Sequence, residues 1–148
     1  MGSNGVDFLV TEQGPVVLEV NSRFQGSLDT VEKAMGINLF EAHAGCFRGE
    51  LPEKPEAKLF AARGVIYSDR ELFIDRKLME VILREKSADI PPQETVIEPD
   101  WPLTSLFAFA STREEVIKSL EEGAERIKTF IADHMTGETG SLSSAREA

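Results

Sequence analysis

Cysteine and long apolar runs are almost absent from this chain of 148 residues. Cys46 is the only cysteine, so the chain has no intrachain disulfide, which fits a reducing cytosol. No apolar run reaches the ~18 to 20 residues that a membrane-spanning helix needs. The opening stretch, MGSNGVDFL, lacks the basic and apolar regions of a signal peptide. We therefore expect a cytoplasmic protein with no membrane partner.

Positive charge is also scarce. The chain has 16 Lys and Arg residues against 26 Asp and Glu residues, a formal net charge of −10. Binding to a nucleic acid backbone or to an anionic membrane needs basic surface, so we expect neither partner. A small phosphorylated ligand needs only a local basic cluster and stays compatible with this charge.

The first third of the chain predicts a hairpin followed by helices. Two β-rich runs, 6–10 and 16–20, flank the turn residues TEQGP, which predicts a hairpin with a loop of about five residues. The helical pattern of 29–49 is broken at Gly36 and restarts with Asn38 as its N-cap.

The rest of the chain predicts a small β module closed by a long helix. Strands are expected in the four β-rich regions 58–68, 71–76, 95–98 and 102–110. Thr112 and Glu115 have the spacing of a capping box, and apolar residues then recur along one helical face as far as Met135.

These elements predict an α+β fold in three parts. Residues 1–50 form the first part, with the hairpin and the broken helix; the family resemblance described below implies that this part belongs to a catalytic lobe. Residues 51–135, which begin with a proline-punctuated linker, form the β module with its closing helix. Residues 136–148 are polar and rich in Gly and Ser, which predicts a disordered tail.

One strand gathers polar groups on a single face. In the run VVLEVNSRFQG (16–26), alternate positions are occupied by Glu19, Asn21, Arg23 and Gln25. Alternate side chains of a strand point to the same face. Pairing the hairpin symmetrically about Gln13 places Asp7 directly opposite Glu19.

Two opposed carboxylates repel each other unless a cation lies between them. Asn21 adds a neutral oxygen on the same face, and this set of hard oxygen ligands suits Mg²⁺ or Mn²⁺. Arg23 is placed to meet phosphate. The face therefore predicts half of a metal–triphosphate site. The alternative is the solvated outer face of an amphipathic hairpin, which the same alternation also fits.

The residues of this face carry a family resemblance. GVDFLV…VVLEVNSRFQG resembles the late part of the ATP-binding domain of ATP-grasp ligases. It is more similar to the carboligase branch, which is related to biotin carboxylase and the carbamoyl-phosphate synthase large subunit. The shared pattern is an acidic residue about a dozen positions before E-x-N-x-R. The resemblance implies the C-terminal portion of an ATP-grasp domain, an antiparallel sheet with flanking helices, followed by the small β module.

The resemblance also implies roles for five residues and the cofactors ATP and Mg²⁺ (or Mn²⁺). Glu19 is expected to bridge two metal ions, Asp7 to bind one of them and Asn21 the other. Arg23 is expected to steady phosphate or an acyl phosphate. Gln25 matches the glutamine that holds bicarbonate in biotin carboxylase. Arg23 and Gln25 are thus the expected catalytic residues.

Two positions depart from the pattern. Ser22 stands where a proline is usual, and Ser27 stands where biotin carboxylase has a catalytic glutamate. The expected reaction is activation of a small-molecule carboxylate as an acyl phosphate for attack by an amine or another nucleophile. The alternatives are a carboxylase-like enzyme that activates bicarbonate and a non-catalytic module for subunit contact.

The family's Gly-rich phosphate loop and lysines lie upstream of the residues that match here. We therefore expect the chain to be a C-terminal piece of a longer enzyme, or the second chain of a split one. It would work with an upstream ATP-grasp lobe and be inactive alone, and a homodimer is kept as an option.

Four other residues are expected to be structural. His43 and Trp101 are expected to pack against neighbouring side chains. Arg63 and Arg76 are expected to pair with surface carboxylates rather than with phosphate.

Overall fold

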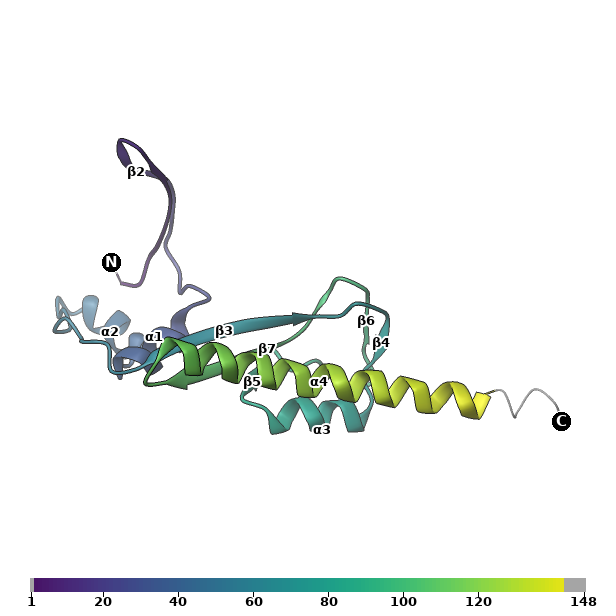
Figure 1. The fold of residues 1–148 in the computed structure, drawn as a ribbon. Coiled ribbons are helices and arrows are strands. Elements are labelled where there is room, and N and C mark those ends of the chain that lie inside the picture. Colours follow the sequence, from purple (N-terminus) through teal and green to yellow (C-terminus); the bar gives the residue numbers. More distant parts are fainter. Residues whose placement is uncertain (1, 143–148) are drawn as a thin grey trace. The chain divides into compact units, whose positions relative to one another are not determined.

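The computed structural model describes residues 2–142, and the side chains of residues 2–134. The predicted α+β class is confirmed: antiparallel strands alternate with four helices within the described part of the chain. The chain separates into two compact units, residues 1–61 and residues 62–148. The first holds a hairpin and two helices, and the second holds the remaining elements apart from the first two residues of the strand Phe60–Tyr67 (Figure 1).

The hairpin consists of β1 (Gly5–Thr11) and β2 (Gly14–Asn21), which run antiparallel. Thr11 pairs with Gly14, so only two residues separate the strands, and the predicted loop of five residues is wrong. Gly14 has a φ of 113°, which L side chains rarely adopt. The Thr11 hydroxyl donates a hydrogen bond of 2.8 Å to the Gly14 carbonyl and closes the turn.

A β-bulge in β2 brings Asp7 opposite Glu19. Phe8 pairs with Val17, and the register then shifts between Asp7 and Phe8, which leaves Leu18 as an extra residue. Without that shift Asp7 would face Leu18, and Glu19 would point to the opposite side of the hairpin. The predicted pairing of Asp7 with Glu19 is confirmed, but it depends on the bulge and not on a symmetric hairpin.

Helices α1 (Leu28–Met35) and α2 (Leu39–Cys46) are separated by a short break. Gly36 ends α1 with a left-handed φ of 67°, as glycine commonly does at a helix C-terminus. The Asn38 side chain caps α2 by accepting a hydrogen bond of 2.8 Å from the backbone N–H of Glu41. The predicted break and the predicted cap are both confirmed.

The second unit contains two small sheets. In the larger one, β7 (Pro102–Ala110) lies between β3 (Phe60–Tyr67) and β5 (Ser87–Ala88). In the smaller one, β4 (Leu72–Phe73) pairs antiparallel with β6 (Val96–Ile97). Each predicted strand region of this unit contains one of these strands, whereas the sequence did not indicate β5.

Helix α3 (Arg76–Arg84) was not expected from the sequence. Asp75 caps it, because its Oδ1 accepts a hydrogen bond of 2.8 Å from the backbone N–H of Leu78. Leu78 and Ile82 are one turn apart and both are buried. The aspartate before an apolar i, i+4 pair was the signal that could have revealed this helix.

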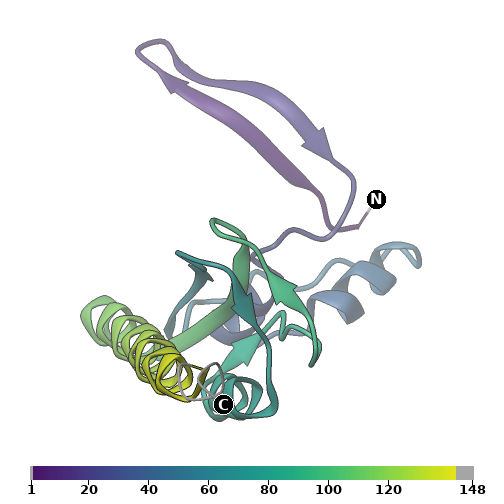
Figure 2. The same cartoon turned by 90° about the vertical axis from the view of Figure 1, so that its right-hand side faces the viewer.

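Helix α4 (Arg113–Leu142) lies beside α3, as Figures 1 and 2 both show. Its predicted capping box is confirmed: the N–H groups of Thr112 and Glu115 each donate to the other residue's side chain, at 3.2 and 3.3 Å. The tail predicted for 136–148 begins within α4, and residues 143–148 lie outside the described residues. In the described part of the chain, no helix is long and apolar enough to cross a membrane.

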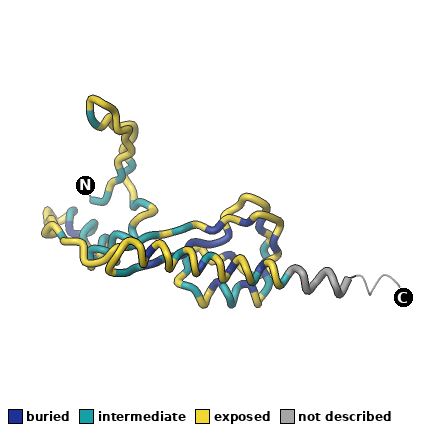
Figure 3. Tube along the Cα trace, in the orientation of Figure 1, coloured by how far each residue is buried: buried dark blue, intermediate teal, exposed yellow. Residues whose placement is uncertain are grey.

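The apolar core lies in the second unit, as far as the structure describes the chain. Its members come from the strands, from both helices of this unit and from the link between β4 and α3: Ile66, Leu72, Ile74, Leu78, Ile82, Ile97, Leu103, Leu106, Ile127 and Ile131. Among residues 2–61 only Gly45 is buried, and the hairpin is exposed along most of its length (Figure 3). Trp101 is 58% exposed, so its predicted packing role is wrong.

Candidate functional site

Three residues expected to bind metal lie together near the open end of the hairpin. Asp7 is the cross-strand partner of Glu19, and Asn21 is the partner of Gly5, the next residue on the same face. The side chains of Asn21 and Asp7 touch, because Asn21 Nδ2 donates a hydrogen bond of 3.3 Å to Asp7 Oδ2. Asp7 and Glu19 are exposed, so both carboxylates are open to a ligand.

This donor set fits a hard divalent cation in part. It offers two carboxylates and one amide, while the described residues contain no group of three or more His, Cys, Asp and Glu residues that could hold a metal. An Mg²⁺ or Mn²⁺ ion here would take its other ligands from water or nucleotide phosphates, as Mg²⁺ commonly does. The Asn21 amide donates through nitrogen, so it must turn over before its oxygen can face a cation.

Arg23 and Gln25 lie beyond the end of β2. The Arg23 N–H donates to the Asn21 carbonyl at 2.9 Å, which turns the chain out of the strand. Gln25 Nε2 donates to the Arg23 carbonyl at 2.9 Å, and Arg23 Nη1 donates to the Phe24 carbonyl at 3.3 Å. The alternation of the strand therefore places Glu19 and Asn21 on one face, but it ends at Asn21. Arg23 and Gln25 lie in the turn that follows.

Gly5 makes room for that turn. A Cβ atom built on Gly5 would lie 2.1 Å from Cδ of Gln25, a distance at which the Gln25 side chain has to move. Gly5 was not among the residues expected from the sequence to shape the site. A glycine inside a strand is a known sign of close approach, and it was the available signal.

An aromatic cluster anchors the same turn to α2. The Phe24 ring lies 4.8 Å from the His43 ring, between centroids, and the His43 ring lies 5.3 Å from that of Phe47. His43 Nδ1 also accepts a hydrogen bond of 2.9 Å from the Ser3 N–H. His43 therefore has the predicted packing role, and Phe24 ties the residues around Arg23 to a helix.

Residues 1–27 match the family model of the ATP-grasp domain. The matched segment contains Asp7, Glu19, Asn21, Arg23 and Gln25, and it supports membership of the ATP-grasp superfamily.

An uncharacterized protein of Methanocaldococcus jannaschii is 30% identical to this chain over 125 residues. The similarity covers 84% of this chain and 30% of that relative, so the chain spans less than a third of the relative's length. It extends beyond the ATP-grasp segment into the second unit. No solved structure matches the chain.

The face of the hairpin opposite Asp7 and Glu19 is apolar and exposed. The cross-strand pairs on this face are Val6–Val20, Phe8–Val17 and Val10–Pro15. The exposed fractions of the valine and phenylalanine residues in these pairs run from 47% for Val6 to 83% for Val10. An exposed apolar surface of this kind normally marks a contact with another segment or partner.

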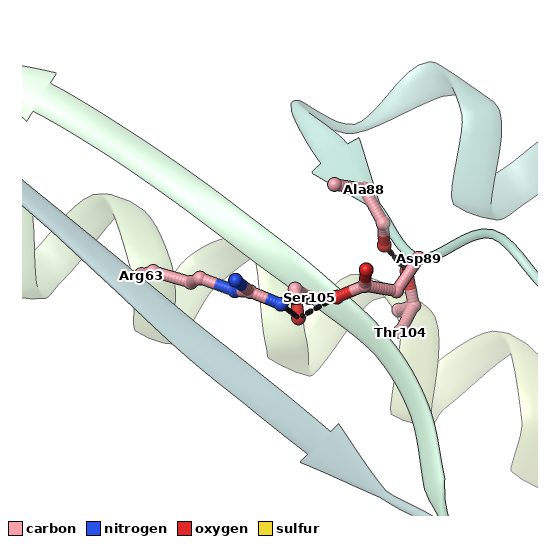
Figure 4. A network of polar contacts seen from close by, with 5 residues as sticks. All are labelled: Arg63, Ala88, Asp89, Thr104 and Ser105. Carbon is pink, nitrogen blue, oxygen red and sulfur yellow. Dashed lines mark hydrogen bonds and ion pairs between the residues drawn. The ribbon is translucent and has the colours of Figure 1, made fainter. Parts of the chain in front are cut away.

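Arg63 and Arg76 have carboxylate partners, as predicted. Arg63 on β3 reaches past Ser105 to Asp89, which follows β5 (Figure 4). Ser105 Oγ accepts from Arg63 at 2.9 Å and donates to Asp89 at 2.7 Å. Arg76 pairs with Glu80 one helical turn away, at 2.9 Å.

Proposed function

We propose that this chain is the C-terminal part of an ATP-dependent, Mg²⁺-dependent ligase of the ATP-grasp type. We place the enzyme in the carboligase branch related to biotin carboxylase and the carbamoyl-phosphate synthase large subunit, and in the cytoplasm. One observation carries the proposal: the bulged hairpin pairs Asp7 with Glu19, beside Asn21, inside the segment that matches the ATP-grasp domain.

The proposed reaction has two steps. The terminal phosphoryl group of ATP passes to an oxygen of a carboxylate substrate, which gives an acyl phosphate and ADP. An amine, or another nucleophile, then attacks the acyl carbon; inorganic phosphate leaves and the attacking nitrogen loses a proton. In sites of this kind, bound divalent cations would neutralise the negative charge of the phosphate groups.

The hairpin residues divide this work. Asp7, Glu19 and Asn21 would hold the cations, since they provide two carboxylates and an amide on one face. Arg23 is a fixed positive charge that can donate two hydrogen bonds to phosphate or acyl phosphate oxygens. Gln25 would orient the substrate through its amide.

The lobe that contains the hairpin needs a partner. Among residues 2–61 only Gly45 is buried, so this unit gains little stability from an apolar core and would be stabilised further by a covering partner. The exposed apolar hairpin face is the natural contact for an upstream ATP-grasp lobe, from the same parent chain or from a separate subunit. The 148-residue chain alone is then inactive, and a homodimer stays a prediction.

Bicarbonate activation is the second candidate reaction. Gln25 favours it, because it stands where biotin carboxylase holds bicarbonate, and Ser27 opposes it, because it replaces the catalytic glutamate. A non-catalytic contact module is a third candidate, which the exposed apolar hairpin face favours. A measurement of ATP-dependent turnover by the complete protein distinguishes the ligase from the non-catalytic contact module.

Replacing Glu19 by Gln in the complete enzyme tests the proposed function. Glu19→Gln keeps the shape of the site but removes one negative charge, so turnover should fall by a factor on the order of 10² to 10⁴. Glu12→Gln, in the hairpin turn, is the control and should have little effect. Equal turnover in the two variants would mean that this face does not carry the chemistry.

A further inference from the structure

The second unit contains a cavity of about 470 Å³ between the end of β3 and α4. This volume is within the range of 300 to 1,000 Å³ typical of sites for small ligands. None of its lining residues belongs to the segment that matches the ATP-grasp domain, and all of them belong to the second unit.

The cavity has an apolar floor and a charged rim. Ile66, Leu72 and Ile131 line it and are at most 9% exposed. The charged lining residues are two acids and two bases: Asp69, Glu125, Arg70 and Lys128. Opposite charges are therefore equal in number around an apolar surface.

Ser68 holds the turn that presents Asp69 and Arg70. Ser68 is buried; its N–H donates to the Trp101 carbonyl at 2.9 Å, and its carbonyl accepts from the Asp100 N–H at 2.7 Å. The Ser68 hydroxyl donates to the Arg70 carbonyl and accepts from the Arg70 N–H at 3.3 Å. The backbone of this turn is thus fixed before any ligand arrives, which lowers the entropic cost of binding.

The ion pair on the turn can readily change partners. Asp69 and Arg70 pair with each other through contacts of 2.7 and 2.8 Å, and their side chains are 73% and 48% exposed. The hydrogen bond from Arg70 is the main cause of the lowered pKa of Asp69, and the charge of Lys128 adds to it. An exposed pair contributes little stability, so a ligand carboxylate can replace Asp69 as the partner of Arg70 at small cost.

We propose that this cavity binds a free amino acid with an apolar side chain. The ligand carboxylate pairs with Arg70 and Lys128, its ammonium group pairs with Asp69 and Glu125, and its side chain rests on the apolar floor. A zwitterion matches both pairs of charges, whereas a plain anion or cation leaves one pair without a partner. The proposal does not depend on ATP-grasp activity.

Titration of the 148-residue chain with L-leucine tests the proposal, with backbone amide shifts and calorimetry as readouts. Leucine should shift the amides around Asp69 and Lys128. Lys128→Met and Asp69→Asn should each weaken binding by about tenfold, because each removes one charge-assisted contact. Lys118→Met, on the same helix but outside the cavity, is the matched control and should leave affinity unchanged.

Two analogues sharpen the test. The compounds 4-methylpentanoate and isopentylamine each keep the apolar chain but lack one of the two charges, so each should bind about tenfold or more weakly than leucine. Leucine shifts that survive in Lys128→Met and Asp69→Asn would overturn the proposal. So would equal binding of 4-methylpentanoate, or the absence of any leucine-dependent shift.

Discussion

The Gln25 side chain occupies the space that a side chain at position 5 would fill, so position 5 requires glycine. The Gln25 side chain lies over the backbone of Gly5 and donates to the Arg23 carbonyl, so it fixes the turn that carries Arg23. Neither the strand alternation nor the E-x-N-x-R pattern contains this contact. The sequence identified the polar groups, and the structure adds the residue that lets two of them fold together.

Gly5→Ala should displace Gln25 while leaving the hairpin paired. The added Cβ would lie 2.1 Å from Gln25 Cδ, so the side-chain amide signals of Gln25 should shift in an NMR spectrum. In the complete enzyme we expect a rate loss on the order of 10²-fold, as for other small misplacements of catalytic groups. Gly26→Ala is the control, since a Cβ there meets nothing within 4 Å. Unchanged Gln25 signals in Gly5→Ala would contradict this packing.

Two carboxylates make the second unit sensitive to acid. Burial raises the pKa of Asp75, but hydrogen bonds from the Leu78 N–H and from His134 outweigh it, so the pKa is lowered overall. A hydrogen bond from Arg126, at 2.8 Å, is the main reason that the pKa of Glu85 is also lowered. In both cases folding favours the ionised carboxylate.

The direction of the pH dependence follows from those shifts. Because both pKa values are lower in the folded chain, the stabilisation is complete above the unfolded values, about 4. It is lost as pH falls through the folded values. Asp75→Asn keeps an N-cap but removes the titration, so its unfolding free energy should fall less steeply below pH 4. Urea unfolding followed by circular dichroism measures this; an equally steep fall in the variant would contradict it.

At the scale of elements, locally determined features could be predicted. Gly36, Asn38 and Thr112 end or begin helices through contacts with residues three or four positions away, and all three predictions are confirmed. Helix α3 was missed because its N-cap, Asp75, and its first residue, Arg76, fall within the predicted strand region 71–76. The two-residue turn was missed because Gly14-Pro15 was assigned to the loop rather than to the beginning of β2.

The bulge is the element on which the site depends. The predicted partner of Asp7 is correct although the predicted turn is not. The real turn is shorter than predicted, and the extra residue Leu18 makes up the difference. No sequence pattern used here indicates a bulge at this position. Its consequence is that register, and not composition, places the two acids on one face.

Deleting Leu18 should preserve the pairing of Asp7 with Glu19, because the regular ladder that starts at the turn then brings these residues together. Deleting Val10 is the matched control, since it moves Asp7 out of line with Glu19 by one position. Cross-strand NOEs between the two residues should persist in the first variant and vanish in the second. Loss of the NOEs on deletion of Leu18 would show that the register is set elsewhere.

At the scale of the whole molecule, burial is unevenly divided. The described core lies in the second unit, while the unit that contains the ATP-grasp segment buries only Gly45 among residues 2–61. Composition gave no sign of this division, because apolar residues occur in both units. The chain spans 30% of the length of its relative from Methanocaldococcus jannaschii.

Asp7 and Glu19 are proposed to form half of a metal–nucleotide site. Mn²⁺ added to the 148-residue chain broadens the NMR signals of nearby amides even at low occupancy, so it reports a weak site directly. We predict selective broadening around both residues, lost in Glu19→Gln and Asp7→Asn and kept in Glu12→Gln. Broadening that is confined to the acidic surface of α4, or that persists unchanged in Glu19→Gln, would contradict the account.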